Sequence, residues 1–249
     1  MLKLHIVCSG KCYHDVKRVG HKNFNIFKAK ISNNLDYQQF NDSMVIFSEY
    51  NSRDELLNKY ISIYHVIENF MCKYPLVKLN KDTQGNMFSI RNFKAMYERI
   101  DNGEKKSLEL FLKAISNDSA TESIILESYS LLSDYIDSSE DNKNRVNHSL
   151  LCLDIKNKDN NILDYKKIKS MNVKQNFPVL LSQLIYYIRN AIVHNKETEY
   201  HLSHENLDSE IVDFIENIML PILEQIVLNL IIEKNDIVWY EHQNIKLYA

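Results

Sequence analysis

Glycine and proline are scarce in this sequence, with 4 Gly and 3 Pro in 249 residues. β-Sandwiches and turn-rich barrels need many such residues at their turns, so this scarcity argues against both classes of fold. Cysteine is also scarce, and Cys8, Cys12, Cys72 and Cys152 show no paired spacing. Cys8 and Cys12, followed by His14, resemble half of a zinc site, but no second pair of ligands completes it. We therefore expect free thiols, no metal and no cofactor.

An excess of positive charge is missing as well, because the formal net charge is −3. Nucleic-acid binding depends on clustered Lys and Arg, so any RNA contact must rely on a local patch. Lys166, Lys167 and Lys169 form the tightest basic cluster, which is either a solvated surface or a guide for RNA. The hydrophobic content of 45% is typical of a soluble globular protein.

The N-terminus lacks an apolar run of signal-peptide length, because Lys3, His5 and Lys11 interrupt it. The most apolar segment, 211–232, contains several polar residues, among them Glu216 and Glu224. We expect this segment to be an amphipathic core helix rather than a membrane span, and the protein to be cytoplasmic.

Apolar residues at helical spacing predict a mainly α fold. The pattern of 52–55 is that of a capping box, which predicts a helix that starts at Ser52 and ends before Pro75. Pro178 is expected in the first turn of a later helix. Ser209 is expected to cap the last helix, and Pro221 to kink it. The other predicted helices cover 89–99, 104–115 and 123–136.

Three parts are predicted along the chain. Residues 1–50 are a small irregular or α/β N-terminal cap, with short strands at 2–6 and 44–47. Residues 51–235 form the helical domain, in which 138–175 is a polar, exposed insertion that could contain a short packed element at 150–153. Residues 236–249 are a C-terminal tail, in which 237–240 and 245–248 alternate weakly and could form a short terminal strand or hairpin.

The string 189–194 places Arg189, Asn190 and His194 near the end of a predicted helix. Arg can hold a phosphate with a planar fork of donors, and His can transfer a proton near neutral pH. On an ideal helix Arg189 and His194 point about 140° apart. Because Tyr186 and Val193 add apolar surface to the same outward face, we expect a twofold homodimer that completes the site from two motif helices.

A structural interpretation stands beside this one, since Arg189 and His194 near a helix C-terminus can simply complement the helix dipole. Helical spacing alone favours this interpretation. Glu68 is expected to be a structural ion-pair partner that could also orient Arg189. The remaining polar-segment histidines are expected at the surface, namely His148, His201, His204 and His242.

The wider string 188–197, with Arg189, a polar Asn190 and four residues between Arg189 and His194, resembles the signature of the HEPN superfamily. The resemblance extends over roughly 52–235 and implies an antiparallel helical bundle. It also implies a dimeric, metal-independent endoribonuclease of a toxin or antiviral defence system. His194 would be the acid/base group, Arg189 would hold the scissile phosphate, and Asn190 would orient the pair. The required 2′-OH makes RNA, not DNA, the implied substrate.

Some toxins of this superfamily carry a Tyr two residues after the His, which a partner nucleotidyltransferase modifies. Lys196 stands at that position here, so silencing by that modification is not expected, although another antitoxin or regulatory partner stays open. Two other functions also stay open. One is a non-catalytic HEPN module that binds a nucleotide or a protein partner, and the other is a structural dimerisation protein.

Overall fold

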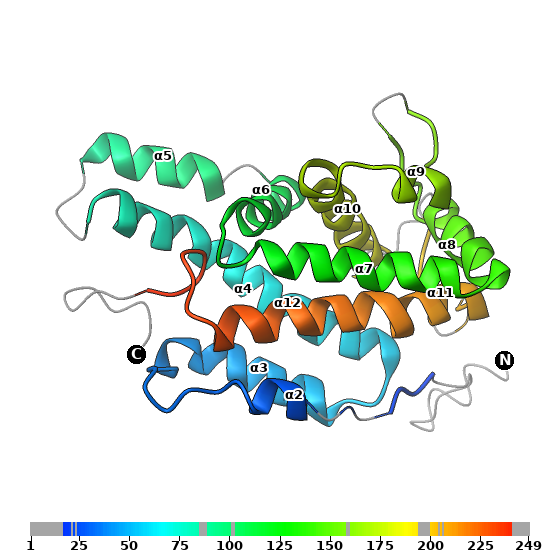
Figure 1. Cartoon of the computed structure of the whole chain (residues 1–249), viewed down its shortest axis with the longest axis horizontal. Helices are drawn as coiled ribbons and strands as arrows, with labels where there is room; N and C mark the ends of the chain where they lie inside the picture. Colours follow the sequence, from blue (N-terminus) through cyan, green and yellow to red (C-terminus); the bar gives the residue numbers. More distant parts are fainter. Residues whose placement is uncertain are drawn as a thin grey trace, which may run out of the picture.

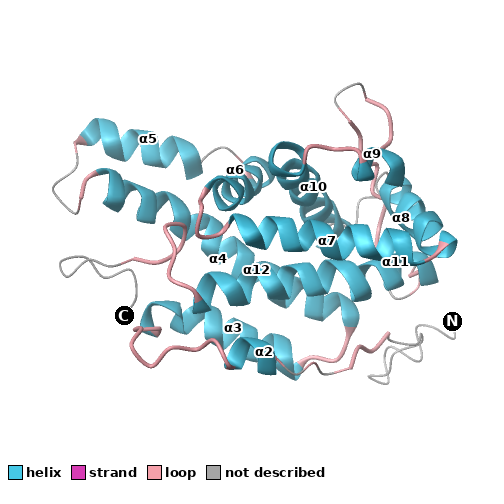
Figure 2. Ribbon diagram, viewed as in Figure 1, coloured by secondary structure: helices cyan, strands magenta, loops and turns pink. Residues whose placement is uncertain are grey.

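A computed structural model of the protein shows that the chain folds mainly into helices (Figure 1). Its described residues contain loops and two isolated β-bridges besides these helices, and no strand (Figure 2). The prediction of a mainly α fold is therefore confirmed. The residues that the structure describes are 17–20, 22, 24–84, 89–100, 103–157, 160–193, 200–203, 205 and 207–240.

The helices differ greatly in length, and α4 is the longest of those described. In chain order they are α2 (Asn25–Lys28), the 3-10 helix η1 (Gln38–Phe40), α3 (Asn41–Ser52), α4 (Leu56–Asp82), α5 (Ile90–Ile100), α6 (Glu104–Asn117), α7 (Glu122–Ser138), α8 (Glu140–Cys152), α9 (Tyr165–Lys169), α10 (Val173–Val193), α11 (Ser209–Phe214), the π-helical turn η2 (Ile215–Met219) and α12 (Leu220–Ile232).

Helix α12 packs against both α4 and α7, and α10 packs mainly against α6 and also against α7 and α4 (Figure 1). Helix α3 lies along α4, and α8 contacts α11. One continuous hydrophobic core runs from Val19 to Trp239. The predicted N-terminal cap and C-terminal tail thus both contribute side chains to the core of the helical domain.

The strand predicted at 44–47 is wrong, because these residues belong to α3. Ser43, Phe47 and Tyr50 are buried at helical spacing, whereas Met44 and Val45 are exposed. A run of four apolar residues does not distinguish a strand from a helix, and packing against α4 decides for the helix. The strand predicted at 2–6 lies outside the described residues.

The capping box predicted at Ser52 is also wrong, since Ser52 is the last residue of α3. Glu55 caps α4 instead, and its carboxylate accepts hydrogen bonds from the amides of Leu57 at 2.7 Å and Asn58 at 2.6 Å. Helix α4 continues through Pro75, where the prediction ended it. Pro75 is itself buried, so packing outweighs the cost of one missing backbone hydrogen bond.

Residues 138–175 are not an exposed insertion. Ser139 caps α8 by accepting from the amide of Asn142, and Val146, Leu150 and Leu153 bury one face of this segment in the core. The other faces of α8 are polar, and the overall polar composition of 138–175 therefore indicated an exposed segment. The packed element considered at 150–153 lies at the end of this helix.

Helix α10 starts five residues before Pro178, which therefore lies inside the helix and not in its first turn. A proline at this position cannot donate to the carbonyl of Lys174, four residues earlier. Ser116 of α6 supplies the missing donor, with its Oγ 3.0 Å from that carbonyl oxygen. A side chain of α6 thus replaces the backbone hydrogen bond that Pro178 removes from α10.

The last helical run begins one residue away from the predicted cap, because Asp208 and not Ser209 accepts from the amide of Ile211. The π-helical turn η2 ends two residues before Pro221, where the prediction placed a kink. The stretch Ser209–Ile232 is long and apolar enough to cross a membrane by length and composition, and 72% of its most apolar window is buried within the fold.

Residues 237–240 do not form a strand, because the tail makes a turn over 236–238 and then continues irregularly to 240. Its Trp239 is buried, and Nε1 donates to the carbonyl of Leu230 at 3.0 Å. The second half of the predicted terminal strand, 245–248, lies outside the described residues.

Candidate functional site

The end of α10 carries the motif that the sequence singled out. Ile188 and Ala191 are buried and fix this turn of the helix against the core. Arg189 and Asn190 lie beside them and are partly exposed, and Val193 is the last described residue of α10. His194 lies outside the described residues, so its position relative to Arg189 stays a prediction.

Arg189 is held by residues of three helices. Its Nε lies 3.4 Å from Oε1 of Glu104, the first residue of α6. Its guanidinium carbon lies 5.7 Å from the ring centroid of Tyr64 on α4. Its Nη1 donates to Oδ1 of Asn190 at 3.0 Å. The side chain is only 21% exposed, so its direction is fixed by these contacts and not by solvent.

Tyr64 and Glu104 also contact each other beneath the Arg189 guanidinium group, at Oε1 of Glu104. The Tyr64 hydroxyl donates to Oε1 of Glu104, the same oxygen that faces Arg189. Burial of Tyr64, its hydrogen bond to Glu104 and the charges of Glu104 and Glu68 raise the Tyr64 pKa well above its usual value, although Arg189 opposes them. Tyr64 is therefore a hydrogen-bond donor at any physiological pH and not a base.

Positive and negative groups are mixed at this end of α10. Lys105 donates to the Tyr187 hydroxyl at 2.7 Å and lies 4.5 Å from the centroid of that ring. Glu104 lies next to Lys105 in the first turn of α6, whose N-terminal end carries positive polarisation. The cluster offers Arg189 and Lys105 to an anion, and Glu104 competes for Arg189.

Tyr186 and Val193 were predicted to form apolar surface on the outward face of α10, and this surface is smaller than predicted. Tyr186 is partly buried against the core and its ring centroid lies 5.5 Å from that of Tyr187. Val193 is 48% exposed and is the more accessible of the two predicted strip residues. A dimer through this face therefore stays a prediction.

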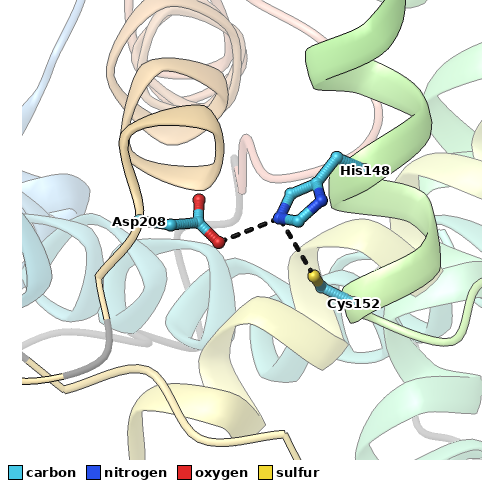
Figure 3. Close-up of side chains that lie close together, drawn as sticks. All are labelled: His148, Cys152 and Asp208. Atoms are coloured by element: carbon cyan, nitrogen blue, oxygen red, sulfur yellow. Dashed lines mark hydrogen bonds and ion pairs between the residues drawn. The ribbon is translucent and has the colours of Figure 1, made fainter.

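A second cluster was missed by the sequence interpretation, which placed His148 at the surface. His148 Nε2 lies 2.9 Å from Oδ2 of Asp208 and 3.3 Å from Sγ of Cys152 (Figure 3). Its other ring nitrogen, Nδ1, lies 3.2 Å from Oε2 of Glu210. Helix α8 carries His148 and Cys152 four residues apart, a signal that the sequence does contain. Nothing in the sequence pairs them with Asp208, 60 residues further on.

Cys152 and His148, with Asp208 beside them, resemble the arrangement that activates a nucleophilic thiol. Such a thiol needs a lowered pKa. At Cys152 burial raises the pKa, the charges of Asp208 and Glu210 raise it further, and Tyr200 opposes them in part. The surroundings therefore favour the neutral thiol, and the cluster is poorly suited to nucleophilic catalysis.

Comparisons of the chain with models of protein families, with curated proteins and with solved structures gave no match in any of the three. The function is therefore inferred from the residues of this chain and their geometry.

Proposed function

We propose that the protein is a metal-independent endoribonuclease of the HEPN type, acting in a toxin or antiviral defence system. The observation that carries the proposal is the placement of Arg189. It lies on α10, four residues before Val193, and Glu104, Tyr64 and Asn190 fix its direction. An arginine that is ordered before the substrate arrives loses little freedom when it binds a phosphate.

The proposed reaction uses the RNA 2′-OH as nucleophile. His194 removes the proton of this hydroxyl, the 2′-oxygen bonds to the phosphorus, and the 5′-oxygen leaves with a proton returned by an acid group. Arg189 stabilises the charge that develops on the phosphate oxygens. Asn190 holds the guanidinium. The products are a 2′,3′-cyclic phosphate and a 5′-hydroxyl end, and no metal takes part.

We further propose a homodimer in which two copies of α10 face each other. Arg189 and His194 point apart by about 140° on one ideal helix, so two chains offer a simple way to place an acid and a base on either side of one phosphate. The exposure of Val193 at the end of α10 leaves room for such a contact.

One observation favours the alternative, a non-catalytic HEPN module that binds a nucleotide or a protein. Glu104 already faces Arg189, and the surroundings mix acidic and basic groups rather than forming a basic groove. A module of this kind needs no proton transfer, and its Arg189 would serve only to orient a ligand.

The deciding experiment is RNA cleavage by the full chain with EDTA added at the start of the reaction. We expect cleavage by the wild type, cyclic phosphate ends on the products, and a loss of at least about 100-fold in His194→Ala and Arg189→Ala. Arg145→Ala is the matched control, because Arg145 pairs with Asp213 on another part of the fold.

Equal rates in the wild type and both motif variants would refute the proposed site. A wild type that never cuts RNA but is stabilised against heat by nucleotides would select the binding module. In cells, expression of the wild type is expected to slow growth, and expression of His194→Ala is not.

A further inference from the structure

We propose that His148, Cys152 and Asp208 bind a Zn²⁺ ion that joins α8 to the segment before α11. The three side chains place one nitrogen, one sulfur and one carboxylate oxygen within 4.8 Å of one another. Helix α8 brings His148 and Cys152 to the same face, because residues four apart lie one above the other. Asp208 meets them from the N-terminus of α11 (Figure 3).

The distances suit a tetrahedral ion. Zinc bonds of about 2.0 Å to nitrogen or oxygen and about 2.3 Å to sulfur give a nitrogen–sulfur edge of about 3.5 Å and a nitrogen–oxygen edge of about 3.3 Å. From His148 Nε2, the Cys152 Sγ lies at 3.3 Å and the Asp208 oxygen at 2.9 Å. Along these two edges the ligands would move apart by only a few tenths of an ångström, and the Cys152 sulfur and the Asp208 oxygen lie within 4.8 Å of each other. A mixed nitrogen, sulfur and oxygen set is one that zinc accepts.

Glu210 adds what a zinc-bound histidine usually has, a carboxylate on the other ring nitrogen. Its Oε2 lies 3.2 Å from His148 Nδ1, so Nδ1 can carry the proton and Nε2 can offer its lone pair to the ion. Two carboxylates thus face the two nitrogens of one ring. A cation on the Nε2 side would be attracted by both carboxylates.

Tyr200 provides an independent observation. Its hydroxyl oxygen is buried, and its hydrogen-bonding neighbour is the Cys152 thiol. A buried hydroxyl needs an acceptor, and a neutral thiol is a weak one. A thiolate held on zinc, or a water molecule bound to the ion, would give this hydroxyl an acceptor.

The ion would have a structural consequence for the chain that follows α10. The amide of Leu202 donates to the carbonyl of Ala191 at 2.7 Å, and Leu202 is buried, so the chain is attached to α10 at that point. Zinc would replace the hydrogen bond between Asp208 and His148 by metal bonds and so hold this chain more firmly to α8. The side chains of His148 and Asp208 are 35% and 41% exposed, so the ion could enter from solvent.

The test is a zinc titration of the chelator-treated full chain, in competition with a chromophoric chelator, with thermal melting before and after zinc. We expect one high-affinity Zn²⁺ whose binding raises the melting temperature. Cys152→Ser and Asp208→Asn are expected to lose it; the asparagine side chain can still cap α11. Glu210→Gln is expected to weaken binding by about 10- to 100-fold. Cys72→Ser is the matched control, since Cys72 is an exposed free thiol on α4.

Cobalt gives a second readout. The Co²⁺ protein is expected to show a sulfur-to-cobalt charge-transfer band that Cys152→Ser abolishes and Cys72→Ser retains. The proposal is overturned if the wild type binds no zinc, or if Cys152→Ser and Asp208→Asn bind it as tightly as the wild type does. Both readouts report metal and stability and not RNA cleavage, so their result is separate from that of the proposed nuclease.

Discussion

Lys73 lies on α4 with most of its side chain inside the fold, and this burial lowers its pKa to about 8. Its ammonium nitrogen lies 4.1 Å from the ring centroid of Phe40 and donates to the carbonyl of Gln39 at 3.1 Å. In the unfolded chain the same group titrates at its ordinary value of 10.5. Between these two pH values the unfolded chain holds more protons than the folded one, so the free energy of unfolding must rise with pH.

The size of the effect follows from the two pKa values. The full difference would add about 2 kcal/mol to the free energy of unfolding between pH 7 and about pH 9.5. The ammonium group keeps part of its contact with solvent, which screens the effect, so we expect about 1 kcal/mol. This stability is largest above the unfolded pKa and is lost as the pH falls through the folded one.

The measurement is urea unfolding of the wild type and of Lys73→Met at several pH values. Methionine has nearly the same shape and no charge, so titrations elsewhere in the chain cancel in the difference between the two proteins. We expect the wild type to gain on the variant as the pH rises. A difference that stays constant within about 0.3 kcal/mol, or that moves against the wild type, would refute the reasoning.

Three further predictions concern stability and are measured by the same unfolding assay. Glu55→Ala should lower the free energy of unfolding by about 1–2 kcal/mol, because it removes the acceptor of two amides in the first turn of α4. Ser52→Ala should be nearly neutral, and equal losses in the two variants would contradict the assignment of Glu55 as the cap. Asn235→Ala should cost about 2–4 kcal/mol, since this buried amide makes four backbone hydrogen bonds; a cost below about 1 kcal/mol would contradict this. Leu150→Ala should cost about 2–5 kcal/mol, but Leu151→Ala, at a 58% exposed position, less than about 0.5; similar costs would mean that α8 is not part of the core.

The sequence predicted best the helices whose apolar periodicity is strong. Helices α6 and α7 begin within a residue or so of the predicted positions. It failed where a local pattern competed with packing. Pro75 indicates a helix end locally, but the buried side chains around it keep α4 intact. The pattern of 52–55 indicates a capping box at Ser52, but α3 extends to Ser52 and packs on α4, so Glu55 caps α4 instead.

The candidate sites follow the same division. The position of Arg189 at the end of a helix could be predicted from spacing, but its contact with Glu104 could not, because the two residues are brought together only by the packing of α10 on α6. The proximity of His148 to Asp208 is of the same kind. Pairs that are distant in the chain leave no trace in the periodicity of one sequence.

The bond from Ser116 to the carbonyl of Lys174 has a consequence for how this chain can change over time. Pro178 leaves that carbonyl without its helical donor, and only then does the Ser116 hydroxyl matter. If Pro178 were replaced by alanine, the new amide could take over the bond, and Ser116 could then be lost at little cost. If Ser116 were lost first, this partly buried carbonyl would lose its protein donor. The two substitutions are therefore epistatic, and the order in which they occur sets the stability of the intermediate protein.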